Sequence, residues 1–164
     1  YHRVMEYIDF ANMGKGEEAS MEYLRECFKF LVKNRAIEEE TVDLIDLSKI
    51  YNFFDSDIGR EAILASEEKR LYKEKPFTLE LIRDGKKILV QGVIDCLIIK
   101  EDSAILIDYK SNKMKDNSEG EKKRIRDTYR TQIEIYEEAV KKGINVKKTE
   151  NYLYLFNSGE FIKM

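Results

Sequence analysis

The hydrophobic and polar positions of residues 86–110 form two apolar runs that are separated by a short polar break at residues 101–103. Both runs are rich in Val, Ile and Leu, which is typical of strands, and the break is short enough for an antiparallel hairpin. Before them, apolar and polar residues alternate over 77–83, and Asp84-Gly85 is a strong hairpin signal that joins this segment to the first apolar run. The pattern therefore predicts three antiparallel strands in series.

Apolar residues recur at helical spacing in much of the remaining chain. They predict helices at about residues 2–13, 17–34, 38–51, 59–67 and 121–142, with a short strand at 70–74 and a helix C-cap at Gly143. A last strand over 146–156 follows the long helix, so we expect a crossover connection and parallel pairing with the central sheet. The predicted fold class is α/β: a mixed sheet (three antiparallel strands, a helix and a further strand) with a helical N-terminal cap.

The length of 164 residues predicts one domain, in which residues 1–68 form a helical part and residues 69–164 an α/β core. The net charge is −3, which is not that of a free-standing nucleic-acid-binding protein. The charges are unevenly distributed, because residues 1–68 contain 8 Lys and Arg against 16 Asp and Glu, whereas residues 69–164 contain 21 against 16. Any affinity for phosphate must therefore come from a local basic cluster.

The two cysteines, Cys27 and Cys96, lie in apolar segments and are predicted to be reduced core residues of an intracellular protein. Two cysteines cannot supply a four-cysteine iron–sulfur cluster. We find no signal peptide and no apolar run approaching the roughly 18 residues of a membrane span. The sequence starts inside a helical pattern and without Met, so we expect it to be a fragment of a larger chain.

Three charged residues interrupt the apolar hairpin: Asp95 in the first strand, and Asp108 and Lys110 in the second. Residues two apart in a strand share a face, so Asp108 and Lys110 point the same way. Two carboxylates on adjacent strands can bind a hard cation such as Mg2+, and a lysine beside them can orient a water molecule or neutralise a transition state. The alternative is a salt-bridged hairpin in which Lys110 pairs with one of the acids.

Further candidates follow the hairpin. Gln132 and Tyr136 are one helical turn apart on the predicted long helix, and a Gln on its buried side needs hydrogen-bond partners. A local basic cluster also follows Lys110 and could hold a phosphate backbone, or could be a solvated helix face. The DNA-binding residues predicted from it are Lys113, Lys115, Arg124 and Arg130.

Several short motifs occur in one order along almost the whole chain, and together they resemble the RecB-type nucleases of the PD-(D/E)XK superfamily. The resemblance is strongest to the nuclease domains of bacterial AddAB-type helicase-nucleases, at the C-terminal end of AddA. The motifs are His2-Arg3-Val4-Met5-Glu6, Glu74-Lys75-Pro76-Phe77, Gly92-Val93-Ile94-Asp95, Asp108-Tyr109-Lys110 and Gln132-Ile133-Glu134-Ile135-Tyr136.

The resemblance implies a restriction-endonuclease-like fold and a role for each motif. It implies that the metal ligands are His2, Asp95, Asp108 and the backbone carbonyl of Tyr109. Lys110 is then the catalytic lysine. Gln132 and Tyr136 line the site, where they contact DNA or support the ligands. The implied cofactor is Mg2+, with Mn2+ as a substitute and no iron–sulfur cluster.

The implied activity is that of a Mg2+-dependent deoxyribonuclease, expected to be an exonuclease that processes double-strand ends for recombinational repair. The expected partners are a single DNA strand delivered from a duplex end, a helicase part of the same polypeptide and an AddB-like partner, with no membrane. The expected location is the bacterial cytoplasm. Two other functions remain open: a catalytically silent DNA-binding or docking module with a retained nuclease fold, and a purely structural domain.

Overall fold

The computed structural model describes residues 1–164, except for the side chain of Glu39. The chain forms two compact units. We call residues 1–71, 109–113 and 154–160 the helical unit, and residues 72–108, 114–153 and 161–164 the sheet unit.

The helical unit contains four α-helices and two short 3-10 helices within its described residues. They are α1 (His2–Tyr7), η1 (Phe10–Gly14), α2 (Glu17–Lys33), η2 (Glu39–Leu44), α3 (Leu47–Phe54) and α4 (Asp57–Glu67). Apolar side chains at helical spacing meet in its core, where Val4, Leu24 and Phe53 are completely buried. The unit also includes two segments from later in the chain, residues 109–113 and 154–160.

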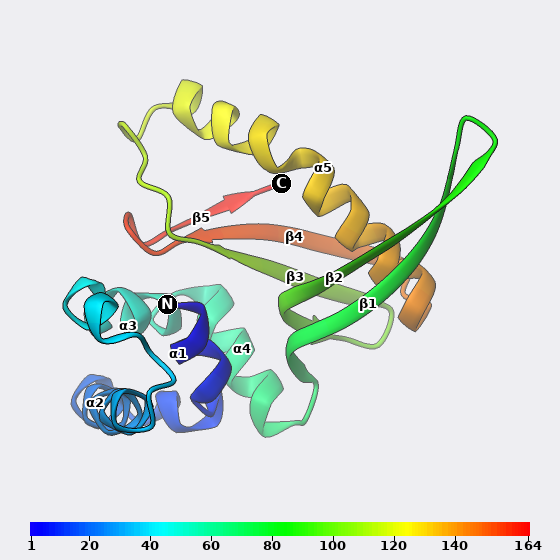
Figure 1. Cartoon of the computed structure of the whole chain (residues 1–164). Helices are drawn as coiled ribbons and strands as arrows, with labels where there is room; N and C mark the ends of the chain where they lie inside the picture. Colours follow the sequence, from blue (N-terminus) through cyan, green and yellow to red (C-terminus); the bar gives the residue numbers. More distant parts are fainter. The chain divides into compact units, whose positions relative to one another are not determined.

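The sheet unit contains most of the five-stranded sheet that the described residues form, in which the strands follow one another in chain order. The elements are β1 (Leu71–Arg83), β2 (Lys86–Ile99), β3 (Ser103–Lys110), α5 (Glu119–Ile144), β4 (Lys148–Leu155) and β5 (Glu160–Lys163). Helix α5 lies along one face of the sheet (Figure 1). The chain therefore has the predicted α/β fold class, with N-terminal helices and a mixed sheet.

Two sheet predictions are confirmed. Asp84 and Gly85 form the tight turn of the β1–β2 hairpin with φ of 51° and 72°, as a type I′ turn requires. Strands β3 and β4 run parallel, because backbone hydrogen bonds join both their beginnings and their ends. Lys147 N donates to Asp102 O at 2.9 Å, and Phe156 N donates to Lys110 O at 3.0 Å.

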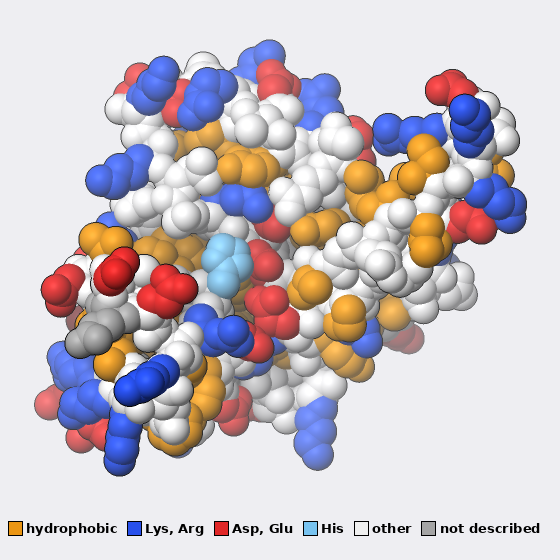
Figure 2. Space-filling model, viewed as in Figure 1, with side chains coloured by type: hydrophobic (Ala, Val, Ile, Leu, Met, Phe, Trp, Pro, Cys, Tyr) orange, Lys and Arg blue, Asp and Glu red, His pale blue; other side chains and the backbone are white. Residues whose placement is uncertain are grey.

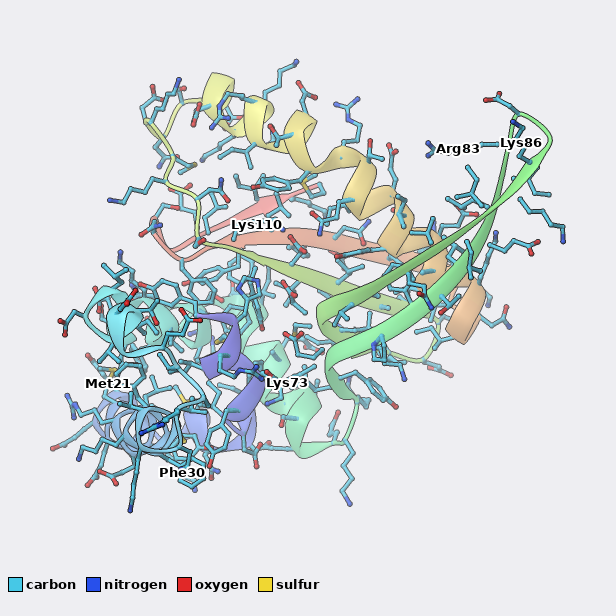
Figure 3. The ribbon with its side chains drawn as sticks, viewed as in Figure 1. Met21, Phe30, Lys73, Arg83, Lys86 and Lys110 are labelled. Carbon is cyan, nitrogen blue, oxygen red and sulfur yellow. The ribbon has the colours of Figure 1, made fainter. Side chains whose placement is uncertain are left out.

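The hairpin of β1 and β2 forms a long arm (Figure 1). Apolar and basic side chains are interleaved on it in the space-filling view (Figure 2). Ile82 is 72% exposed and Leu89 is 65% exposed, while Arg83 and Lys86 flank the turn (Figure 3). Pro76 lies inside β1, where the sequence indicated a break. An edge strand tolerates it because proline's missing N–H need not face a neighbour.

Aspartate caps divide two segments that the sequence predicted as single helices. The predicted helix 2–13 is α1 followed by η1, because Asp9 accepts a hydrogen bond from Ala11 N at 3.1 Å and starts a new turn. The predicted helix 38–51 is η2 followed by α3, because Asp46 accepts from Ser48 N at 3.0 Å. Asp46 is therefore the N-cap of α3.

Two C-terminal details also differ from prediction. Helix α5 ends at Ile144, and its C-cap is Asn145 instead of Gly143; Asn145 adopts the left-handed conformation with φ of 55°. Strand β5 was not predicted, since it is only four residues long. Cys27 and Cys96 are buried and are not joined in a disulfide, as expected. No helix among the described residues has both the length and the apolar character needed to cross a bilayer.

Candidate active site

The two acids of the apolar hairpin lie on neighbouring strands of the sheet unit. Strands β2 and β3 pair antiparallel, with Cys96 opposite Ile107 and Leu97 opposite Leu106. Continuing this register by one residue places Asp95 opposite Asp108. Opposite residues of an antiparallel pair lie on one face, with Cβ atoms about 4.5–5.5 Å apart. Like charges at that separation repel each other, and a hard divalent cation with oxygen ligands would relieve the repulsion.

Asp108 is 2% exposed and receives a hydrogen bond from helix α5. The Nε2 atom of Gln132 donates to Asp108 Oδ1 at 3.2 Å and to the Tyr136 hydroxyl at 2.8 Å. Gln132 and Tyr136 are i and i+4 on α5, so they share one face of the helix. The structure thus brings three of the predicted site residues together: Asp108, Gln132 and Tyr136.

Tyr136 in turn contacts the β1–β2 hairpin. Its ring meets that of Phe77 edge to face, with centroids 5.4 Å apart and planes at 74°. Gly92 lies under this pair: a Cβ on Gly92 would be 2.7 Å from two ring carbons of Phe77 and 3.6 Å from Tyr136 Cε1. The sequence motifs contain both Phe77 and Gly92, but nothing in the pattern predicted that they touch the glutamine-bearing helix.

Tyr109 and His2 meet inside the helical unit. Tyr109 is 2% exposed and its ring contacts those of Phe53, at 5.8 Å between centroids, and Phe156, at 5.5 Å. The His2 ring meets it edge to face at 5.8 Å. His2 is exposed, and it is the only histidine of the chain, so it is the pale-blue side chain of Figure 2. The Tyr109 side chain is therefore part of the core, and only its backbone carbonyl is predicted to bind a metal.

Lys110 ends β3 and is half-buried (Figure 3). Its backbone carbonyl accepts the hydrogen bond from Phe156 N. The next carbonyl, that of Ser111, accepts from Asn157 Nδ2. Two bonds thus fix the backbone that directly follows the Lys110 side chain within the helical unit.

No group of three or more His, Cys, Asp or Glu side chains suited to hold a metal occurs among the described residues. His2, Tyr109 and Lys110 belong to the helical unit, whereas Asp95 and Asp108 belong to the sheet unit. The oxygen donors of the acid pair fit a hard divalent cation. The complete ligand set with His2 and the Tyr109 carbonyl stays a prediction.

The four predicted DNA-binding residues differ in their surroundings. Lys113 and Lys115 are exposed. Arg124 instead binds Glu121 with two hydrogen bonds, of 2.8 Å to Oε2 and 2.7 Å to Oε1. These bonds, with one from the Lys115 amide, lower the pKa of Glu121 to about 2. Arg130 pairs with Asp127. The two arginines are therefore less available to a phosphate than the two lysines.

The chain is similar in sequence to a nuclease superfamily and to subunits of helicase-nucleases. A family model described as "PD-(D/E)XK nuclease superfamily" matches residues 1–162. Proteins named as the A subunit of an ATP-dependent helicase/nuclease are similar throughout: 33% identical over 94% of this chain in Clostridium novyi, 31% over 99% in Bacillus cereus and 33% over 99% in Ruminiclostridium cellulolyticum. The chain spans only 13–14% of the length of these relatives.

Proposed function

The chain belongs to the PD-(D/E)XK nuclease superfamily, and from this premise we propose that it is a metal-dependent nuclease domain that hydrolyses DNA phosphodiester bonds. The observation that supports this most is the pair Asp95 and Asp108 on adjacent strands, with Asp108 buried and bonded to Gln132. A buried carboxylate that faces another is costly unless hydrogen bonds, an ion pair or a bound cation compensate its charge.

In this proposal the metal ligands are Asp95, Asp108, His2 and the Tyr109 carbonyl. A bound Mg2+ lowers the pKa of a water ligand and stabilises charge on a phosphate oxygen. Gln132 keeps the Asp108 carboxylate oriented through its Nε2 donor. Lys110, two residues along β3 from Asp108, orients the attacking water or neutralises the phosphate.

The helicase/nuclease relatives motivate a wider proposal. The domain acts within a longer polypeptide whose helicase part delivers a single strand from a duplex end, together with an AddB-like partner. Its role there is exonucleolytic processing of double-strand ends for repair in the bacterial cytoplasm. Lys113 and Lys115, with smaller contributions from Arg124 and Arg130, hold the strand's phosphates.

A cleavage assay with Asp→Asn pairs tests the activity. Asp108→Asn keeps the shape of the side chain but removes the charge, so it should abolish Mg2+-dependent cleavage of linear single-stranded DNA. Asp102→Asn is the matched control, because Asp102 is exposed on the β2–β3 turn, where its side chain and its carbonyl accept hydrogen bonds from Lys147. It should leave cleavage unchanged.

Lys110→Ala should also abolish cleavage while the circular dichroism spectrum stays that of the wild type. Equal cleavage by the wild type and Asp108→Asn would overturn the proposal. DNA binding that is the same in Mg2+ and in EDTA, with no cleavage by the wild type, would favour a silent docking module instead.

A further inference from the structure

We propose that Phe77, seated on Gly92, is a positioning residue that acts through Tyr136 and Gln132 on the Asp108 carboxylate. The inference rests on the proposed function for its consequence, the binding of a divalent metal. It rests on the contacts of the sheet unit alone for its mechanism. All five residues lie in that unit.

The first step is the close approach of Phe77 to the backbone of β2. A Cβ on Gly92 would lie 2.7 Å from Phe77 Cε1 and Cζ, a distance that real Cβ atoms do not show. The ring therefore occupies space that exists only because residue 92 has no side chain. Gly92 thereby fixes where the Phe77 ring lies on the sheet.

The second step is the orientation of Tyr136. The edge-to-face contact with Phe77, at 5.4 Å and 74°, restricts where the tyrosine ring lies and thus the direction of its long axis. The tyrosine hydroxyl lies at the end of that axis, so the contact also determines where the hydroxyl is. It is 2.8 Å from Gln132 Nε2.

The third step is the orientation of the Gln132 amide. The Nε2 atom carries two hydrogens, and its two acceptors are the Tyr136 hydroxyl and Asp108 Oδ1. A rotation of the amide by half a turn would bring its oxygen against the carboxylate, where both groups are acceptors. The carboxylate therefore opposes this rotation, and the hydrogen bond to the Tyr136 hydroxyl holds the Nε2 atom in its place. A shift of Phe77 that displaces Tyr136 removes this support and weakens the bond that orients Asp108.

The surroundings of Phe77 separate this role from ordinary core packing. Its ring is half-buried and borders a surface hollow of about 540 Å³ between β1 and β2, lined by Pro76, Phe77, Thr78, Gln91, Gly92 and Val93. A shorter side chain there opens the hollow further to solvent and leaves no enclosed cavity. Substitutions of Phe77 are therefore expected to affect Gln132 more than the stability of the fold.

The experiment uses two changes with matched controls. Phe77→Leu is compared with Phe161→Leu, because Phe161 is also half-buried in the sheet unit and meets a tyrosine, Tyr152, edge to face. Gly92→Ala is compared with Gly143→Ala, whose Cβ would meet nothing within 4 Å. The readout is the side-chain amide signal of Gln132 in metal-free ¹⁵N–¹H spectra, assigned by its loss in Gln132→Met.

Phe77→Leu and Gly92→Ala should displace the Gln132 signal, as Tyr136→Phe should, and both controls should leave it in place. Calorimetry should then show a Mn2+ affinity lowered about tenfold by Phe77→Leu, as loss of an outer support of a metal ligand does. Phe77→Tyr keeps the ring edge and should restore both signal and affinity.

An unmoved Gln132 signal in Phe77→Leu, or an equal displacement in Phe161→Leu, would overturn the inference. If Phe77→Leu does not fold, Gly92→Ala, compared with Gly143→Ala, still decides it through the same signal. Failure of the proposed function looks different: the wild type would then bind no Mn2+, while the amide readout would still report whether Phe77 positions Gln132.

Discussion

His2 and Tyr109 meet edge to face, with ring centroids 5.8 Å apart and planes at 74°. The contact joins the first helix to the end of β3, although the two residues are far apart in the sequence. Tyr109 is buried against Phe53 and Phe156, so the exposed imidazole lies against a packed aromatic cluster. The predicted histidine ligand is thus held beside the residue that follows the predicted aspartate ligand.

Replacement of His2 by Phe should distinguish the contribution of its aromatic ring from that of its metal-binding nitrogens. His2→Phe keeps an aromatic contact with Tyr109 but removes the metal donor, so Mn2+ affinity in calorimetry should fall by about tenfold or more. The melting temperature should change little, since the side chain is exposed. Tyr7→Phe, at another exposed position of α1, is the control. An unchanged Mn2+ affinity in His2→Phe would remove His2 from the ligand set.

Tyr109 should matter to stability through its ring and to catalysis through its backbone. Tyr109→Ala is expected to lower the free energy of unfolding by about 3–5 kcal/mol, the usual cost of removing a buried aromatic ring. Tyr109→Phe keeps the ring contacts and the carbonyl, and should retain most of both stability and cleavage. Urea unfolding of the two variants measures the difference, and an equal loss in both would contradict this assignment.

Glu121 should make the stability depend on acid. Bonds from Arg124 and the Lys115 amide lower its folded-state pKa to about 2, below the value of 4.5 expected when the chain unfolds. The stabilisation is therefore fully present above about pH 4.5 and is lost as the pH falls towards 2. The difference in unfolding free energy between wild type and Glu121→Gln should narrow over this range.

Urea unfolding at several pH values between 6 and 2 measures that difference. Glu134→Gln changes an exposed glutamate of the same helix and is the control. A constant difference between wild type and Glu121→Gln over this range would show that the ion pair with Arg124 does not form in solution.

The basic residues should contribute unequally to DNA binding. Lys113→Ala with Lys115→Ala should reduce the slope of log affinity against log salt by about 1.4 in total, about 0.7 for each lysine–phosphate interaction removed from a single strand. Arg124→Ala should reduce it less, because Glu121 holds its guanidinium. Fluorescence anisotropy with a single-stranded oligonucleotide, in the Asp108→Asn background, measures the slopes. A larger effect from Arg124→Ala would reverse this ranking.

The β1–β2 hairpin should tolerate truncation of a side chain at its exposed tip much better than at its buried end. Ile98→Ala removes a completely buried side chain and should cost about 2–5 kcal/mol of unfolding free energy. Ile82→Ala, at a position that is 72% exposed on the arm, should cost less than about 0.5 kcal/mol. A large cost for Ile82→Ala would indicate that the arm is covered in solution, for example by a second copy of the chain.

Features that depend on neighbours in the sequence could be predicted. The alternation of apolar residues and the Asp84-Gly85 turn are local signals, and they gave the β1–β2–β3 order with Asp95 and Asp108 on adjacent strands. Predicted helix boundaries were wrong where a single polar side chain caps a new helix, as Asp9 and Asp46 do. The extra strand β5 was missed because four residues carry too little periodicity.

The amino-acid sequence by itself determined the α/β class, the family motifs and the residue types of the candidate site, because these follow from local periodicity and composition. Only the tertiary structure decided that Gln132 bonds to Asp108, that Phe77 sits on Gly92 beside Tyr136, and that Arg124 is occupied by Glu121. The reason is physical: such contacts depend on how helix α5 lies on the sheet and how side chains fill the space between them, which no spacing along the chain specifies.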